Sequence, residues 1–297
     1  MIMISLKIIA AINQDVVSDK GNLESYSWLL SQTEIFLKAA PVEKILTGNS
    51  TIDSTYYWSN DRRKGQSVQS IGCINSSFSN VELEPWQIAA FLYVGSGSVA
   101  SLAPEMFSLV SGTEHFLLLQ VDYTQVTIDF SKQLLSMLRA TPDYNSGTIL
   151  DDPTVHPTYQ TLSPSNRDAY VKEFDIERES LGALYMGSSS ERYATCYEFL
   201  HRCTDLHVRL DLQDTSRVSE FGRILDNSGV VITSVNITNV LEYGVPMDSF
   251  RNLPIHSKAP VLFSMCGFNF QNGTQCMLEP SLDSCQNRIK SILWERD

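Results

Sequence analysis

Apolar runs of strand length alternate with helical patterns over the chain from Pro85 onward. The runs with strand character are residues 88–94, 115–121, 206–212, 230–235 and 260–266. Patterns with helical spacing follow the first three of them, at residues 102–110, 127–138 and 217–227. Strands that are apolar along their whole length, alternating with helices, are typical of a parallel sheet covered on both faces. We therefore predict an α/β fold with a mostly parallel sheet and helices on both faces.

The residues before this alternation have a different character, and we interpret residues 1–84 as an N-terminal segment of helices and loops. Residues 23–40 place apolar side chains at helical spacing, whereas residues 47–80 are rich in Ser, Asn and Gly, as loops are. The apolar run 1–12 contains Lys7 and lacks a basic leading region, so we interpret it as the start of a buried helix rather than a signal peptide. Residues 85–297 then form the sheet domain.

A long insertion, residues 141–190, separates the second helical pattern from the third predicted strand. Structureless connections of this length are usually lids, binding loops or disordered segments, and we predict a lid. At its end, Ser188-x-x-Glu191 predicts a capping box that opens a helix over residues 192–202.

Glycines and polar residues follow four of the predicted strands, at the points where the strands end. Ligands of doubly wound sheets bind outside the carboxyl ends of the strands, so these residues are candidates for a binding site. Glycine lets the backbone approach a ligand, a carboxylate accepts hydrogen bonds from ribose hydroxyls, and an amide holds an amine or a carboxylate. The candidates in strand order are Gly95, Ser96 and Gly97; Asp122 and Tyr123; Asp211, Leu212 and Asp214; and Asn236, Asn239 and Tyr243.

Each of these residues also has an ordinary structural explanation. Gly95 and Gly97 suit a tight turn, Asp122 and Asp214 suit helix N-caps, and asparagine is common in loops. Spacing favours a ligand site, because Asp122 lies about 25 residues beyond the glycines, near the ~20 of dinucleotide sites. The chain has no Gly-Lys-Ser/Thr after the glycines and no G-x-S-x-G elbow, so a P-loop and a hydrolase nucleophile of that type are excluded.

In this order, the strand-end residues resemble those of the class I S-adenosylmethionine-dependent methyltransferases. The resemblance covers roughly residues 85–266 without the insertion, and it implies a Rossmann-like sheet and S-adenosylmethionine as the cofactor. It further implies that Gly95, Ser96 and Gly97 pass the methionine and ribose, and that Asp122, followed by Tyr123, binds the ribose. A residue among Asp211, Leu212 and Asp214 would contact the adenine. The catalytic or acceptor-binding groups would be Asn236, Asn239 and Tyr243.

The sequence departs from the methyltransferase pattern at two positions, and alternatives stay open. Tyr93 stands where that family usually has an acidic residue, and Val99 stands where it often has a third glycine. The Gly-Ser-Gly-Ser form and the run from Asn239 to Tyr243 are similar to nicotianamine-synthase-like and betaine-lipid-synthase-like enzymes. Those enzymes transfer the aminocarboxypropyl group of the same cofactor. A degraded glycine loop also suits a non-catalytic interaction protein.

Charge narrows the range of partners. The chain has 22 basic and 34 acidic residues and a formal net charge of -12. We therefore expect no nucleic-acid partner, since phosphate binding needs clustered Lys and Arg. The insertion alone holds 3 basic and 8 acidic residues, which suits a neutral or cationic small-molecule or peptide acceptor, although the same charges suit a solvated surface. No stretch approaches the ~20 apolar residues of a membrane span.

Six scattered cysteines without a C-x-x-C pair favour free thiols and a cytoplasmic protein. The spacing of Cys196, His201, Cys203 and His207 matches no usual zinc pattern. We therefore predict no metal site, with a buried thiol and solvated histidines instead. The sequence leaves the oligomeric state open.

Overall fold

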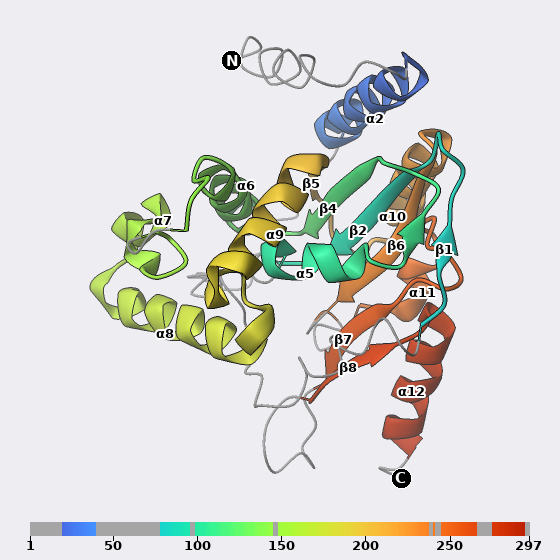
Figure 1. Cartoon of the computed structure of the whole chain (residues 1–297). Helices are drawn as coiled ribbons and strands as arrows, with labels where there is room; N and C mark the ends of the chain where they lie inside the picture. Colours follow the sequence, from blue (N-terminus) through green and yellow to red (C-terminus); the bar gives the residue numbers. More distant parts are fainter. Residues whose placement is uncertain are drawn as a thin grey trace.

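The core of the protein is a six-stranded sheet with the strand order β5-β4-β2-β6-β7-β8 (Figure 1). The computed structural model describes residues 20–39, 78–95, 99–144, 148–237, 240, 245–265 and 275–294. All neighbouring strands are parallel except β7 and β8, which are antiparallel. The predicted α/β fold with a Rossmann-like, mostly parallel sheet is therefore confirmed. The strands are β2 (Ile88–Tyr93), β4 (Phe116–Asp122), β5 (Cys203–Arg209), β6 (Val230–Ile237), β7 (Val261–Met265) and β8 (Gln275–Glu279).

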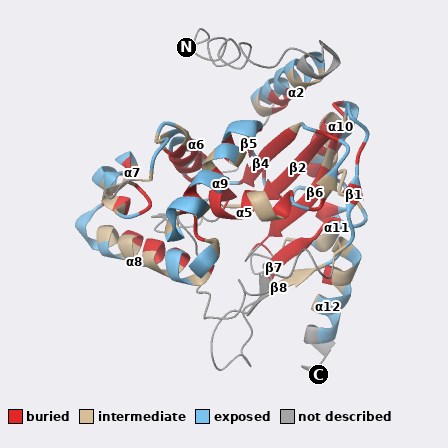
Figure 2. Ribbon diagram, in the orientation of Figure 1, coloured by how far each residue is buried: buried red, intermediate tan, exposed pale blue. Residues whose placement is uncertain are grey.

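Helices cover both faces of the sheet, and the alternation of side chains along β2 separates two apolar clusters. Ala89, Phe91 and Tyr93 face one cluster, whereas Ile88, Ala90 and Leu92 face the other. Figure 2 shows the strands as the most buried part of the molecule. The first face is covered by α5 (Val99–Met106), α6 (Gln125–Arg139) and α9 (Ser190–Arg202). The second is covered by α2 (Lys20–Ala39), α10 (Thr215–Asn227), α11 (Met247–Phe250) and α12 (Leu282–Trp294).

Two short strands form a second, two-stranded sheet. They are β1 (Val81–Glu82) and β3 (Val110–Ser111), which pair in parallel. Gly112, directly after β3, has φ +88, and a Cβ there would lie 1.9 Å from the backbone oxygen of Leu83. Only glycine permits this close approach of the two backbones.

The N-terminal segment contributes α2 to the main core. Leu29 and Phe36 of α2 are buried in the second cluster, and the Phe36 ring packs against Phe221 of α10 with centroids 5.5 Å apart. Arg217 of α10 lies 3.7 Å above the Phe36 ring and donates to the Phe36 carbonyl at 2.7 Å. These contacts hold α2 against the sheet domain. The predicted run 1–12 lies outside the described residues.

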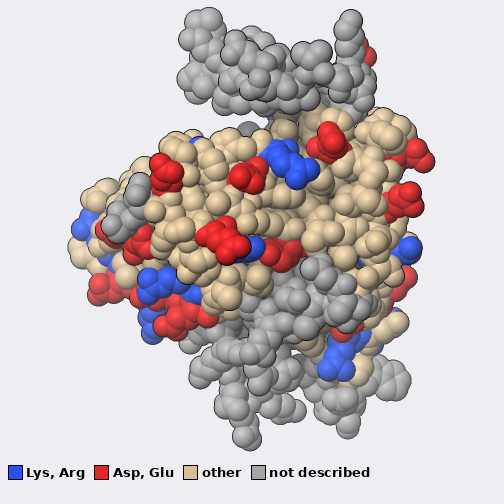
Figure 3. Space-filling model, viewed as in Figure 1, with Lys and Arg blue, Asp and Glu red and all other residues tan. Residues whose placement is uncertain are grey.

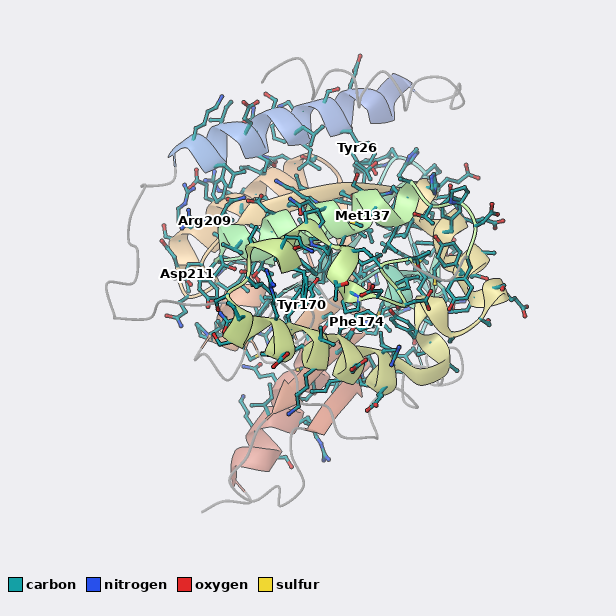
Figure 4. The ribbon with its side chains drawn as sticks, turned by 90° about the vertical axis from the view of Figure 1, so that its left-hand side faces the viewer. Tyr26, Met137, Tyr170, Phe174, Arg209 and Asp211 are labelled. Carbon is teal, nitrogen blue, oxygen red and sulfur yellow. The ribbon has the colours of Figure 1, made fainter. Side chains whose placement is uncertain are left out.

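The described part of the insertion is helical, so the prediction of a structureless connection is wrong. It contains α7 (Pro157–Thr161), α8 (Pro164–Leu181) and the short 3-10 turns η1 (Pro153–Val155), η2 (Gly182–Leu184) and η3 (Met186–Ser188). Tyr170 and Phe174 project from α8 into the first apolar cluster, beneath α6 (Figure 4). The Tyr170 ring meets Phe130 of α6 edge to face, with centroids 6.3 Å apart. Closure of this segment over a ligand stays a prediction.

One hydrogen bond and one ion pair fix the end of the insertion and the start of α9 to α5. The backbone N–H of Met186 donates to Ser101 Oγ at 3.0 Å. Arg192 of α9 makes a bidentate pair with Glu105 of α5, at 2.6 and 2.7 Å. The predicted capping box is wrong by one residue, because Ser189 is the N-cap of α9 and accepts from the Arg192 N–H at 3.1 Å.

The structure bears on three further expectations. Cys196, Cys203 and Cys285 are buried free thiols, as predicted. Among the described helices, none combines the length and apolarity that a membrane crossing requires. The third strand begins and ends three residues earlier than predicted, at Cys203 and Arg209. The apolar residues Leu210 and Leu212 misplaced the prediction, because they are buried in the core without belonging to the strand.

Candidate functional site

The carboxyl ends of β2 and β4 bring Gly95 and Asp122 together, as the strand-end argument predicts. Gly95 follows β2 with φ +83, a conformation that L side chains rarely adopt. A Cβ built on Gly95 meets no atom of the described residues within 4 Å, so these residues leave open space beside the turn. Asp122 is the last residue of β4 and is 7% exposed. This corner of the sheet therefore combines backbone freedom with a nearly buried carboxylate.

The Asp122 carboxylate is held by its own chain. Its Oδ1 accepts from the Thr124 N–H and from Thr124 Oγ1, both at 2.7 Å. Burial raises the pKa of Asp122, and the nearby N–H groups of Thr124, Gly95 and Tyr123 oppose the shift by favouring the ionised form. The capping explanation for Asp122 therefore holds in part, since it satisfies the N–H group of Thr124, the N-cap residue of α6.

A β-bulge places Asn236 on the same face of the sheet as Asp122. Ala90 pairs with Ile232, but Phe91 pairs with Ser234, so Thr233 is an extra residue in β6. An extra residue reverses the face to which the following side chains point. Ile232 faces the second cluster, and without the bulge Asn236 would face it too. With the bulge, Asn236 pairs with Tyr93, whose side chain faces the first cluster. Asn236 is 4% exposed.

Four polar side chains lie in one register line across β5, β4, β2 and β6. The pairs along this line are His207 with Gln120, Gln120 with Tyr93, and Tyr93 with Asn236. Paired residues of parallel strands point to the same face, so the four side chains form a polar row beneath the Gly95 turn. We call His207, Gln120, Tyr93 and Asn236 the polar row.

The polar row is hydrogen-bonded within the sheet and to α6. Gln120 Nε2 donates to the Gly95 carbonyl at 2.5 Å, and Gln120 Oε1 lies 2.6 Å from His207 Nδ1. The Tyr93 hydroxyl lies 3.4 Å from Ser131 Oγ on α6. Burial raises the pKa of Tyr93, so the phenol stays neutral where the methyltransferase pattern would have a carboxylate.

The candidates after β5 occupy a more exposed part of the same edge. Asp211 Oδ1 accepts from the Gln213 N–H at 2.9 Å, and Asp214 caps α10 by accepting from the Arg217 N–H at 3.1 Å. Leu212 is buried in the second apolar cluster. Figure 4 shows Asp211 and Arg209 at the same edge of the molecule.

Tyr123 presents an aromatic ring to solvent directly beyond Asp122. The residue is 43% exposed, and its carbonyl accepts from Arg209 Nε at 3.1 Å. An exposed aromatic side chain beside a carboxylate offers a flat apolar surface to a planar ligand ring.

Four candidates lie outside the described residues, namely Ser96, Gly97, Asn239 and Tyr243. The expected solvated histidines are correct for His201, which is exposed, and wrong for His207, which is half-buried and bonded to Gln120. Sequence reasoning missed Gln120 altogether. Its signal was present, since Gln120 is the one uncharged polar residue within the apolar run 115–121 after His115.

The acidic excess of the insertion is partly internal. Glu173 and Glu177 of α8 are buried, whereas Asp168 and Glu179 are exposed. On the face shown in Figure 3, Lys and Arg side chains alternate with Asp and Glu over the region of α8 at the lower left. This part of the surface is mixed in charge, so the acidic composition of the insertion does not translate into a uniformly acidic patch on that face.

Comparison with known proteins adds little to this geometry. No protein-family profile and no curated protein matches the chain. One solved structure, the rRNA methyltransferase aviRa from Streptomyces viridochromogenes, is similar over 83% of this chain and 97% of that chain. The two are 14% identical, and the TM-score is 0.32. At these values the likeness carries no argument about activity, and the functional reasoning rests on the site itself.

Proposed function

We propose that the carboxyl edge of β2, β4, β5 and β6 binds S-adenosylmethionine, and that the protein transfers the methyl group to a small-molecule or peptide acceptor. One observation carries the proposal. The Asp122 carboxylate ends the strand next to β2, beside a glycine turn with positive φ and open space around it. This is the arrangement in which a doubly wound sheet holds the ribose of a nucleoside cofactor.

The residues around this corner suit the parts of the cofactor. A carboxylate offers about four lone-pair sites, so Asp122 can accept from a ribose hydroxyl in addition to the Thr124 N–H and hydroxyl that bond to its Oδ1. The exposed Tyr123 ring lies next in the chain, where an adenine could pack against it, with Asp211 farther along the edge. Ser96 and Gly97 would complete the glycine turn.

The positively charged sulfonium activates the methyl group for transfer, so the protein needs little covalent chemistry. Its task is to align the acceptor with that methyl group and to exclude water. Asn236, buried at the end of β6, is suited to orient an acceptor, and Asn239 and Tyr243 would follow it in the chain. Transfer of the aminocarboxypropyl group instead is the alternative within the same cofactor site.

A specific observation favours a non-catalytic role as the competing function. Asp122 is already bonded to Thr124 and is only 7% exposed, so a purely structural helix-capping role would account for it. In that case the protein would keep the Rossmann-like fold as an interaction module without a cofactor.

Calorimetric titration with S-adenosylmethionine and S-adenosylhomocysteine separates these functions. Binding of both ligands supports the proposal, and the absence of heat and of a thermal shift refutes both enzymatic functions. Product analysis then distinguishes them, because methyl transfer yields S-adenosylhomocysteine and aminocarboxypropyl transfer yields methylthioadenosine.

Two variants test the role of the carboxylate itself. Asp122→Ala removes a charged acceptor, and we expect the affinity for S-adenosylhomocysteine to fall by about tenfold to a hundredfold. Thr124→Val is the matched control, since it removes the hydroxyl that donates to Asp122 and retains both the backbone N–H bond and the carboxylate. We expect its affinity to stay within a few-fold of the unmodified protein. Equal dissociation constants for both variants and the unmodified protein would remove Asp122 from the site.

A further inference from the structure

Gln120 is an unusual residue in its position. It lies inside β4 between Leu119 and Val121, and it is 0% exposed. A buried amide costs free energy unless its donors and acceptor find partners. The partners of Gln120 are the Gly95 carbonyl, 2.5 Å from Nε2, and His207 Nδ1, 2.6 Å from Oε1. The amide on β4 therefore links the turn after β2, on one side, to β5 on the other.

The chemistry of the partners fixes the direction of this bridge. The Gly95 carbonyl can only accept, so the group of Gln120 that faces it must be the NH₂ group. The amide oxygen then faces His207 Nδ1, which must carry the ring proton and donate it. A reversed amide would set two oxygen lone pairs against each other at Gly95. The Gly95 carbonyl thus fixes the orientation of the Gln120 amide, and that orientation requires a proton on His207 Nδ1.

We propose that His207 and Gln120 are positioning residues that hold the Gly95 turn in its ligand-binding conformation. The inference rests on the proposed function and deepens it, since it assigns two residues that do not touch the ligand to the preorganisation of the cofactor turn. A turn held in place before binding loses less conformational freedom when the ligand arrives. We call the two hydrogen bonds that connect the His207 ring, the Gln120 amide and the Gly95 carbonyl the relay.

The surroundings of His207 keep its imidazole uncharged. Burial lowers the pKa of His207 to about 4. Asp205 on its own strand and Asp129 on α6 oppose this shift, whereas Lys132 and Arg139 of α6 reinforce it. The imidazole is therefore neutral at physiological pH, and its single ring proton is available to Gln120.

Two substitutions break the relay, and two matched variants preserve it. Gln120→Glu keeps the size of the side chain, but its ionised carboxylate cannot donate to the Gly95 carbonyl, and His207→Leu loses the donor to Gln120. His207→Asn retains a donor, because its side-chain NH₂ takes the place of Nδ1–H. His201→Leu controls for the loss of a histidine, since His201 is exposed on α9 and its Nδ1 lies 3.0 Å from the Tyr197 carbonyl one turn before.

The first measurement is the dissociation constant of S-adenosylhomocysteine by calorimetry at neutral pH. We expect Gln120→Glu and His207→Leu to weaken binding by about tenfold, the worth of roughly one hydrogen bond. We expect His207→Asn and His201→Leu to bind within about twofold of the unmodified protein. Unchanged binding in both relay-breaking variants overturns the proposal.

The second measurement uses the protein without ligand and therefore separates the two proposals. In the unmodified protein, ¹⁵N NMR of the His207 ring should show Nδ1 protonated and Nε2 bare. Amide hydrogen exchange at Val94 and Gly95 should be faster in Gln120→Glu and His207→Leu than in the two matched variants. If the protein binds no S-adenosylhomocysteine but these signatures appear, the cofactor assignment fails and the relay stands. The opposite tautomer, or exchange rates equal in all variants, overturns the relay.

Discussion

Arg192 should be among the most sensitive single positions of the first face, because one guanidinium joins three segments. It makes a bidentate pair with Glu105 of α5 and donates from Nε to the Leu184 carbonyl at 3.1 Å. Its Nη2 also donates to the carbonyl of Ser101. Replacing it by alanine therefore uncouples α9, α5 and the end of the insertion together.

The magnitude follows from the burial of the pair. The side chains of Arg192 and Glu105 are 12% and 20% exposed, so Arg192→Ala leaves a largely desolvated carboxylate without its counter-ion. Breaking a buried pair in this way costs about 3–5 kcal/mol, and the partial exposure places our expectation near ~3 kcal/mol. For a chain of this size that corresponds to a fall in Tm of about 6 °C.

Urea unfolding followed by circular dichroism measures this loss, and Arg178→Ala is the matched control. Arg178 pairs with Asp175 at 3.1 Å, and both side chains are 47% exposed. Exposed pairs contribute about 0.2–1 kcal/mol, so this variant should lose no more than that. A double-mutant cycle of Arg192→Met with Glu105→Gln then isolates the pair itself. If Arg192→Ala loses no more stability than Arg178→Ala, the argument that this pair locks the insertion to α5 is refuted.

Three further results are expected. Gly95→Ala should lower the unfolding free energy by about 1–2 kcal/mol because of its φ of +83 alone. Gly112→Ala should lower it more, because its Cβ would lie 1.9 Å from a backbone oxygen. Comparable losses for the two variants in thermal melts would contradict this. Burial lowers the pKa of His156 and of His207 to about 4, so as the pH falls the two histidines are protonated in the unfolded chain before they are protonated in the folded one. The free energy of unfolding should therefore be highest above pH 6.5 and decrease between pH 6.5 and 4, by at most about 3 kcal/mol per histidine. His156→Leu should reduce this dependence of the unfolding free energy on pH, measured by urea unfolding at several pH values. An unchanged dependence would show that His156 does not contribute to it. Phe36→Ala should cost about 3–5 kcal/mol, measured by urea unfolding, since its ring is 2% exposed; a loss below ~1 kcal/mol would show that α2 is not held through this ring.

The central strands were predictable because they are buried on both faces. β2 and β4 are apolar along their whole length, so the predicted bounds agree with the observed ones to within one residue. β5 lies at the edge of the sheet and mixes buried residues with partly exposed ones. Its charged residue Asp205 pairs with Arg139 of α6 at 2.7 Å. A charged residue inside the strand interrupts the apolar pattern from which a strand is predicted. The apolar pattern then favoured a segment three residues too late.

The helices of the insertion escaped prediction for a similar reason. The buried face of α8 contains Tyr170, Phe174 and Leu181, but also Glu173 and Glu177. Two carboxylates at buried positions break the apolar period on which a helix prediction rests. Pro164 at the first helical position was the available signal, because proline is favoured there.

The candidate site shows where sequence spacing stops being informative. Strand ends located Gly95 and Asp122, since parallel strands bring their carboxyl ends to one edge. The face to which Asn236 points depends on one extra residue, Thr233, and threonine is ordinary in any strand.

The contact between Gln120 and His207 depends on register, 87 residues apart in the chain. No local pattern specifies such a pairing, because it arises from the packing of two apolar strands. In the sequence Gln120 interrupts an apolar run, and in the fold its side-chain NH₂ group donates to the Gly95 carbonyl. A polar residue inside a predicted buried strand thus marks a position that strand-end spacing does not reveal, because burial obliges it to find partners.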